Sequence, residues 1–144
     1  MKYVLGLVAL TAALNAPAHA QDSQSALQQC SRGWLAKDWP TVAIYCMSEA
    51  LRQEQDPNLE GMPAEIQGGA LLLAGVDHAR AAVAYGRLHK ESAYNEEKSA
   101  AIADLTKAVG IPGTHQKWAT QLLEFLQSSR FLKDAPDSDL MGTT

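Results

Sequence analysis

Histidine and acidic residues are the side chains of this sequence that could support proton transfer or metal binding. His78 and His89 are eleven residues apart, about 16 Å along a helix, so they are not expected to share a metal ion. His115 falls in the first turn of a predicted helix and is expected to face solvent. The sequence contains no HExxH, CxxC, GxSxG, GxGxxG or P-loop motif. It therefore predicts no catalytic residue, no metal ligand and no cofactor.

The two cysteines are placed symmetrically about a predicted turn. Cys30 and Cys46 each lie eight residues from Asp38, so two antiparallel helices joined there would bring both side chains to the same level. In an oxidising compartment such a pair is expected to form a disulfide bond. The alternatives are two separate buried thiols or a redox-active pair, although neither cysteine belongs to a CxxC unit.

Aromatic residues supply the candidate surface for a partner. Trp34 continues the stripe of Leu27 and Cys30, which have helical spacing, and is predicted to lie in the core. Other aromatic side chains fall off that stripe or on later segments, and such residues give large contact areas at binding surfaces. The candidate partner-binding residues are Trp39, Tyr45, Tyr85 and Tyr94.

Residues 1–20 have the pattern of a secretory signal peptide. Lys2 precedes an apolar stretch from Tyr3 to Leu14, and Ala18-His19-Ala20 places small residues before a cut at Gln21. No cysteine stands at the cut, so no lipid anchor is expected. The pattern predicts a periplasmic protein, with secretion to the medium as the alternative. Cleavage would leave 11 basic and 16 acidic residues, a balance that disfavours nucleic acid as a partner.

The elements that position these residues are predicted to be helices. Apolar residues recur at steps of three and four, and no segment alternates long enough to predict a strand. Asp56-Pro57-Asn58 and Gly61-Met62-Pro63 interrupt the pattern, so residues 56–64 are expected to be the longest internal loop, either a connector or a recognition element. The predicted helical segments are 23–37, 40–55, 64–91, 95–109 and 114–131. The run Asn95-Glu96-Glu97-Lys98 is interpreted as a solvated first helical turn.

The fold class is therefore all-α, built from antiparallel helical hairpins and stabilised by one disulfide bond. Predicted helix stripes include Leu72, Val76, Ala79 and Val83 in one segment, and Ala101, Leu105 and Ala108 in the next. The predicted organisation is a signal peptide at 1–20, a single helical domain at 21–133 and a flexible C-terminal tail at 134–144. No stable membrane insertion is expected after the signal peptide is removed.

A weak internal repeat links the first two helix pairs. The first pair contains Cys30-x-x-Gly33-Trp34-Leu35, and its second helix carries Ala43, Met47 and Ala50. The second pair contains Gly86-x-Leu88-His89, and its second helix carries Ala101, Leu105 and Ala108. The pattern resembles tetratricopeptide-type helical repeats over about residues 24–109. The two turns differ in length and the 34-residue period is not kept, so a small helical bundle is the alternative. The resemblance implies a scaffold that binds protein and has no chemistry of its own.

The sequence favours a protein-interaction module of the cell envelope, acting as an adaptor, an assembly factor or an inhibitor. Its expected partner is another envelope protein. The alternative is a small cell-envelope hydrolase that uses Glu49, Glu65 or Asp77 with a histidine.

Overall fold

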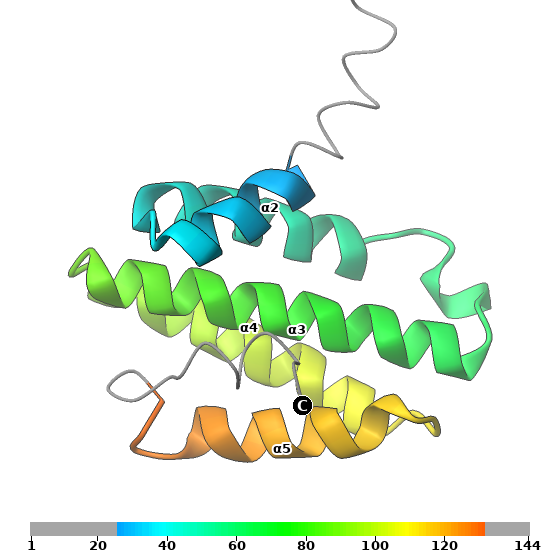
Figure 1. Cartoon of the computed structure of the whole chain (residues 1–144). Helices are drawn as coiled ribbons and strands as arrows, with labels where there is room; N and C mark the ends of the chain where they lie inside the picture. The colour runs from blue at the N-terminus through cyan, green and yellow to red at the C-terminus, as the bar shows by residue number, and fades with distance from the viewer. Residues whose placement is uncertain (1–25, 132–144) are drawn as a thin grey trace, which may run out of the picture.

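The all-α prediction is confirmed by the structure, a computed structural model that describes residues 26–131 (Figure 1). A first helix covers residues 26–36, and within the described range no strand is present. The expected signal peptide and C-terminal tail lie outside this range. The other helices are α2 (Trp39–Glu54), the 3₁₀ helix η1 (Leu59–Gly61), α3 (Ala64–Arg87), α4 (Glu91–Val109) and α5 (His115–Gln127).

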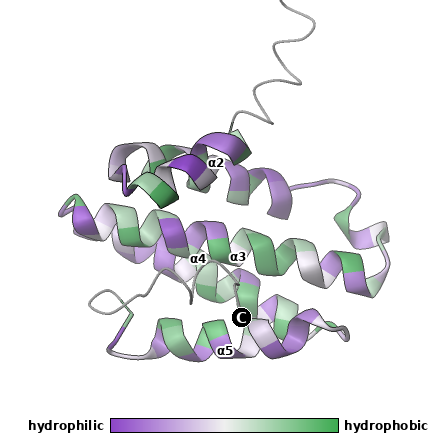
Figure 2. Cartoon of the chain, viewed as in Figure 1, coloured by the Kyte–Doolittle hydropathy of each residue, from purple (hydrophilic) through white to green (hydrophobic). Residues whose placement is uncertain are grey.

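Helix α3 is the centre of the bundle. It packs against α2, α4 and α5, and α4 in turn packs against α5 (Figure 1). Figure 2 shows hydrophobic residues concentrated along α3, in keeping with its central place. Both predicted stripes are buried: Leu72, Val76, Ala79 and Val83 on α3, and Ala101, Leu105 and Ala108 on α4.

Small residues allow the central helices to approach closely. A Cβ atom added to Gly75 of α3 would lie 2.7 Å from Leu105 Cγ of α4, so glycine is required for this crossing. In the first hairpin, a Cβ atom on Gly33 would lie 3.0 Å from Thr41 Cγ2. Although glycine lowers helix propensity, α3 continues without interruption from Ala64 to Arg87.

The first hairpin is closed as its cysteine spacing predicts. Asp38 precedes α2 and accepts a hydrogen bond of 2.8 Å from the Thr41 hydroxyl, while Pro40 occupies the first turn, where no amide hydrogen is needed. Cys30 and Cys46 form a disulfide bond with a Cα–Cα distance of 4.6 Å. Both cysteines are fully buried. The bond therefore fixes the first helix to α2 inside the core.

Loss of this disulfide is expected to cost about 3 kcal/mol of unfolding free energy, because the bond closes a loop of 16 residues. The protein should be reduced in denaturant, refolded with reductant, and compared with the oxidised form by thermal unfolding. We expect a lower midpoint for the reduced form. Alkylation of both cysteines in the native, unreduced protein would contradict the prediction.

Several predicted helix boundaries and one predicted core residue differ from the structure. Helix α3 ends at Arg87, not at residue 91, and α5 ends at Gln127, not at residue 131. Helix α4 begins at Glu91, not at residue 95, because the chain reverses within three residues at Leu88–Lys90. His89 has a φ of 58°, and the Lys90 amide donates to Tyr85 O, so the turn forms without the glycine or proline that would have marked it. Leu27 is 47% exposed, so only Cys30 and Trp34 of its stripe lie in the core.

Gly68 and Gly69 are adjacent on α3, but replacement by alanine is expected to change the stability of the protein in opposite directions. A Cβ atom on Gly69 would meet nothing within 4 Å, whereas one on Gly68 would lie 2.0 Å from the His115 ring. Gly69→Ala is expected to stabilise the protein by about 0.5–1 kcal/mol through helix propensity. Gly68→Ala is expected to destabilise it, because α5 must shift away. Urea unfolding of both variants checks this, and equal effects would contradict it.

Candidate functional site

Four titratable side chains meet inside the bundle around His78. We call Glu54, His78, Glu97 and Asp104 the histidine–carboxylate cluster. His78 Nδ1 lies 2.5 Å from Glu97 Oε2, and His78 Nε2 lies 3.1 Å from Glu54 Oε2. The same Nε2 atom is 3.7 Å from Asp104 Oδ2. Each ring nitrogen of the histidine therefore faces acidic oxygen atoms.

The helices position this cluster through their register. His78 lies near the middle of α3, where the residue is 2% exposed. Glu97 and Asp104 are seven residues apart on α4, so two helical turns place them on the same face. Glu54 is the last residue of α2 and reaches the cluster from the opposite side. Three helices thus contribute to one site.

Charge and burial act in opposite directions within the cluster. Burial alone would lower the pKa of His78, but the hydrogen bond and negative charge of Glu97, together with Glu54, raise it above its ordinary value. Burial raises the pKa of Asp104 to about 8, and the facing Glu54 carboxyl group adds to that rise. Burial also acts to raise the pKa of Glu54, but its contacts with Asp104 and His78 lower it overall. Two carboxyl groups therefore compete for one proton.

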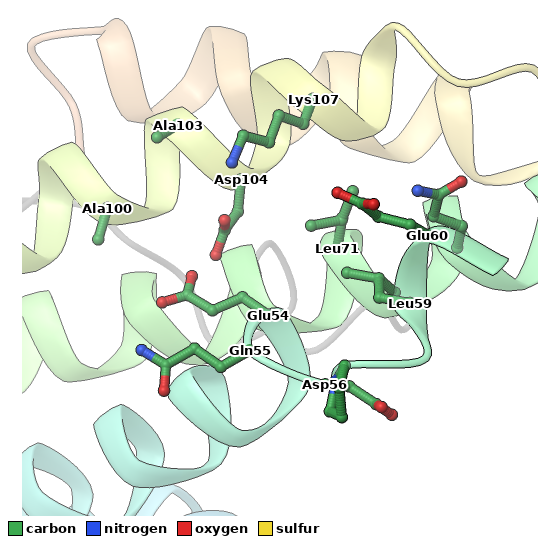
Figure 3. Close-up of a pocket in the computed structure, with 12 residues that line it drawn as sticks. Glu54, Gln55, Asp56, Leu59, Glu60, Leu71, Ala100, Ala103, Asp104 and Lys107 are labelled. Atoms are coloured by element: carbon green, nitrogen blue, oxygen red, sulfur yellow. The ribbon is translucent and has the colours of Figure 1, made fainter. Parts of the chain in front are cut away.

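A cleft of about 710 Å³ opens beside the cluster (Figure 3). Its walls come from the end of α2, the loop with η1, and the facing sides of α3 and α4. In Figure 3 the carboxylates of Glu54 and Asp104 point toward one another across it. Lys107, one turn beyond Asp104 on α4, lies on the same wall. The cleft gives solvent access to two of the four cluster residues.

The loop predicted at residues 56–64 forms part of this cleft. It contains η1, and Leu59 is 8% exposed, so an apolar side chain anchors the loop to the core. Asp56, Pro57 and Glu60 line the cleft beside it. The loop therefore forms part of the cleft wall as well as connecting α2 to α3.

The carboxylates suggested for a hydrolase have other partners. Glu49 is fully buried and accepts a hydrogen bond of 3.0 Å from Arg52 Nε. Asp77 Oδ1 accepts from Arg80 Nη1 at 3.2 Å. Glu65 accepts hydrogen bonds from the Thr114 amide and hydroxyl groups. In residues 26–131 no hydrogen bond joins any of these three carboxylates to a histidine.

A second group of possible ligand atoms surrounds the disulfide bond. Asp77 Oδ1 lies 3.6 Å from Cys30 Sγ, and burial raises the pKa of Asp77 to about 6. The sulfur atoms of Cys30 and Cys46 are bonded to each other, so they offer no thiolate to a metal ion. This group is therefore structural.

The remaining histidines occupy different environments. His115 is 7% exposed, and its Nε2–H group donates to Ala108 O at 2.8 Å. The prediction that it faces solvent is wrong, because the start of α5 packs its ring against Gly68 of α3. His89 lies exposed in the turn before α4. The structure therefore places only His78 in the cluster.

The predicted partner-binding aromatics are all half-buried. Trp39 contacts Trp34 in an edge-on arrangement at 5.9 Å, and Arg87 lies over its ring at the end of α3. Tyr94 stacks on Phe131 with ring centres 6.2 Å apart. Tyr45 and Tyr85 also pack against the core. Each of these rings therefore has an exposed edge and a structural contact.

Glu54, Glu97 and Asp104 are site residues that the sequence did not predict. The interpretation of Glu97 as solvated is wrong, since this residue is 8% exposed and contacts His78. A usable signal was present: Glu97 and Asp104 continue the buried stripe of α4, which reads Glu97, Ala101, Asp104, Leu105 and Ala108. Acidic residues on the apolar face of a helix require a partner.

Comparison with protein-family models, curated proteins and solved structures found no match for this chain. None of the helices in residues 26–131 combines the length and the hydropathy required to cross a membrane.

Proposed function

We propose that this chain is an exported, periplasmic protein-interaction module that serves an envelope complex as an adaptor, assembly factor or inhibitor. The observation that carries the proposal is an apolar strip on the first half of α3. Ile66 is 57% exposed and Leu73 is 48% exposed. Gly69 and Ala70 lie between them and are partly exposed. We call Ile66, Gly69, Ala70 and Leu73 the α3 face.

The first helix leaves this face uncovered. Cys30 contacts Asp77, and Arg80 lies over the ring of Trp34, so the first helix runs beside the second half of α3. Leu27, at its start, is 47% exposed. Exposed apolar residues that gather on one helix face are characteristic of binding surfaces.

The shape of the α3 face fits an amphipathic helix of a partner protein. Ile66 and Leu73 are two turns apart, and the space above Gly69 is open to 4 Å. A partner helix could therefore place an apolar residue between the two larger side chains. The net charge of −4 favours a partner with basic residues beside its apolar face. A relationship to tetratricopeptide-type repeats would be consistent with this role.

The aromatic residues form a second predicted contact region. Trp39 and Tyr85 lie toward the end of the bundle where α3 finishes, and Tyr94 lies in the adjoining start of α4. Their exposed edges could extend a partner contact at that end.

Leu73→Asp is expected to weaken partner binding about 30-fold or more, because truncating a central apolar anchor costs about 2 kcal/mol. Leu35→Asp is the matched control, since Leu35 is 70% exposed on the first helix. A photo-crosslinking residue at position 70 should capture the partner in envelope extract, and Leu73→Asp should abolish that product. Equal capture by both variants would contradict the proposal.

A further inference from the structure

We propose that Glu54, His78 and Asp104 form a binding site for a divalent transition-metal cation, for which Zn²⁺ is the best fit. His78 Nε2 faces Glu54 Oε2 at 3.1 Å and Asp104 Oδ2 at 3.7 Å. The three ligand atoms all lie within 4.8 Å of one another. Ligand atoms of a tetrahedral zinc centre are about 3.3 Å apart, given bonds of about 2.0–2.1 Å. Small side-chain adjustments would therefore bring all three onto one ion.

The fourth protein residue supports this arrangement from behind the imidazole. Glu97 Oε2 lies 2.5 Å from His78 Nδ1, so it accepts the Nδ1–H hydrogen. That contact holds the ring so that Nε2 faces Glu54 and Asp104, and a metal ion bound there would replace the Nε2 proton. A carboxylate on the far nitrogen of a metal-binding histidine is a recurring way to orient the ring and increase its basicity.

A buried carboxylate oxygen atom of the cluster is available to a further ligand. Asp104 is 3% exposed, and its Oδ2 atom accepts no hydrogen bond from the described residues. The Asp104 carboxyl group points toward that of Glu54 (Figure 3). Two facing carboxylates repel one another unless a proton or a cation lies between them. A divalent cation would displace the proton and coordinate the Asp104 oxygen atom.

The donor atoms and the cleft together limit the class of ion. One imidazole nitrogen with two carboxylates suits Zn²⁺ and its first-row neighbours, whereas Ca²⁺ and Mg²⁺ prefer oxygen ligands in larger number. The cleft of about 710 Å³ reaches Glu54 and Asp104 and provides an entry path and room for a water ligand. This site is separate from the α3 face and does not depend on partner binding.

Titration of the chelator-treated protein with Zn²⁺ tests the proposal. We expect one equivalent of Zn²⁺ to bind and to raise the thermal midpoint. Asp104→Asn keeps the side-chain shape but removes a ligand charge, so it should weaken Zn²⁺ binding more than tenfold. Glu97→Gln should weaken it about 10–100-fold, because it removes the support of His78. Glu60→Gln, an exposed acidic residue of the same cleft, is the matched control and should bind as the parent does.

The ligand variants and the binding limit decide whether the proposed zinc site is correct. If Asp104→Asn fails to fold, Glu54→Gln takes its place, since the Glu54 side chain is 21% exposed. Unchanged Zn²⁺ affinity in these ligand variants would place the ion elsewhere and overturn the proposal. Absence of binding at millimolar Zn²⁺ would also overturn it and would leave a proton as the occupant between Glu54 and Asp104. Leu73→Asp should bind Zn²⁺ normally, so the test is independent of the proposed function.

Discussion

Replacement of His78 by alanine is expected to destabilise the protein by about 3–5 kcal/mol, because it removes the shared partner of buried acidic residues. Glu97 and Asp104 are 8% and 3% exposed, so water cannot easily replace the imidazole. Glu54 would also lose its contact with His78 Nε2. The three carboxyl groups would then face each other across a cavity.

The measurement is urea unfolding followed by circular dichroism, with a chelator present so that no metal ion contributes. His89→Ala is the matched control, because His89 is exposed in the turn before α4 and should change stability by less than about 0.5 kcal/mol. His78→Ala combined with Glu97→Gln should lose less than the sum of the two single variants, since the second change removes a stranded charge. A loss below 1 kcal/mol for His78→Ala would contradict this account of the cluster.

The sequence was sufficient to predict the first hairpin and its disulfide bond. Cys30 and Cys46 are close enough along the chain for the turn at Asp38 to fix their relative height. The same local reasoning predicted the buried stripes of α3 and α4. These features follow from helical period and turn position, which depend on neighbouring residues.

The cluster depends instead on how three separate helices are rotated against each other. His78 meets Glu97 across 19 residues and Glu54 across 24 residues. A charged residue on a helix is usually solvated, which is why the sequence alone predicts a solvated Glu97. The burial of Glu97 depends on the close crossing of α3 and α4, where the Leu105 side chain packs against Gly75. Tertiary packing therefore determines the protonation chemistry of the site.

His115 is a second residue whose burial depends on packing between helices and not on local spacing. Its position in the first turn of α5 suggested exposure, but Gly68 leaves a space on α3 that the imidazole ring fills. The Nε2–H group then donates to Ala108 O, at the end of α4. At the start of α5, the Thr114 hydroxyl donates to Glu65 of α3 and makes no capping hydrogen bond within its own helix. Such contacts between helices are not encoded in local spacing.

Trp34→Ala is expected to cost about 3–5 kcal/mol of unfolding free energy, the range for truncating a large aromatic residue in a core. Trp34 is 2% exposed. Arg80 lies 5.7 Å over its ring and also donates to Asp77, which contacts the disulfide bond. Removal of the indole would therefore leave a cavity and loosen the contacts that join the first helix to α3.

Trp39→Ala provides the contrast, because its ring is half-buried and contacts Trp34 at its edge. An aromatic pair of this kind contributes about 0.5–1.5 kcal/mol beyond the buried area, so we expect less than half the loss of Trp34→Ala. Urea unfolding of both variants, with mass spectrometry to verify an intact disulfide, measures the difference. Equal losses would show that Trp39 is as structural as Trp34 and would remove it from the predicted partner-binding residues. A small loss together with weaker partner capture would place the aromatic region, as well as the α3 face, in the interface.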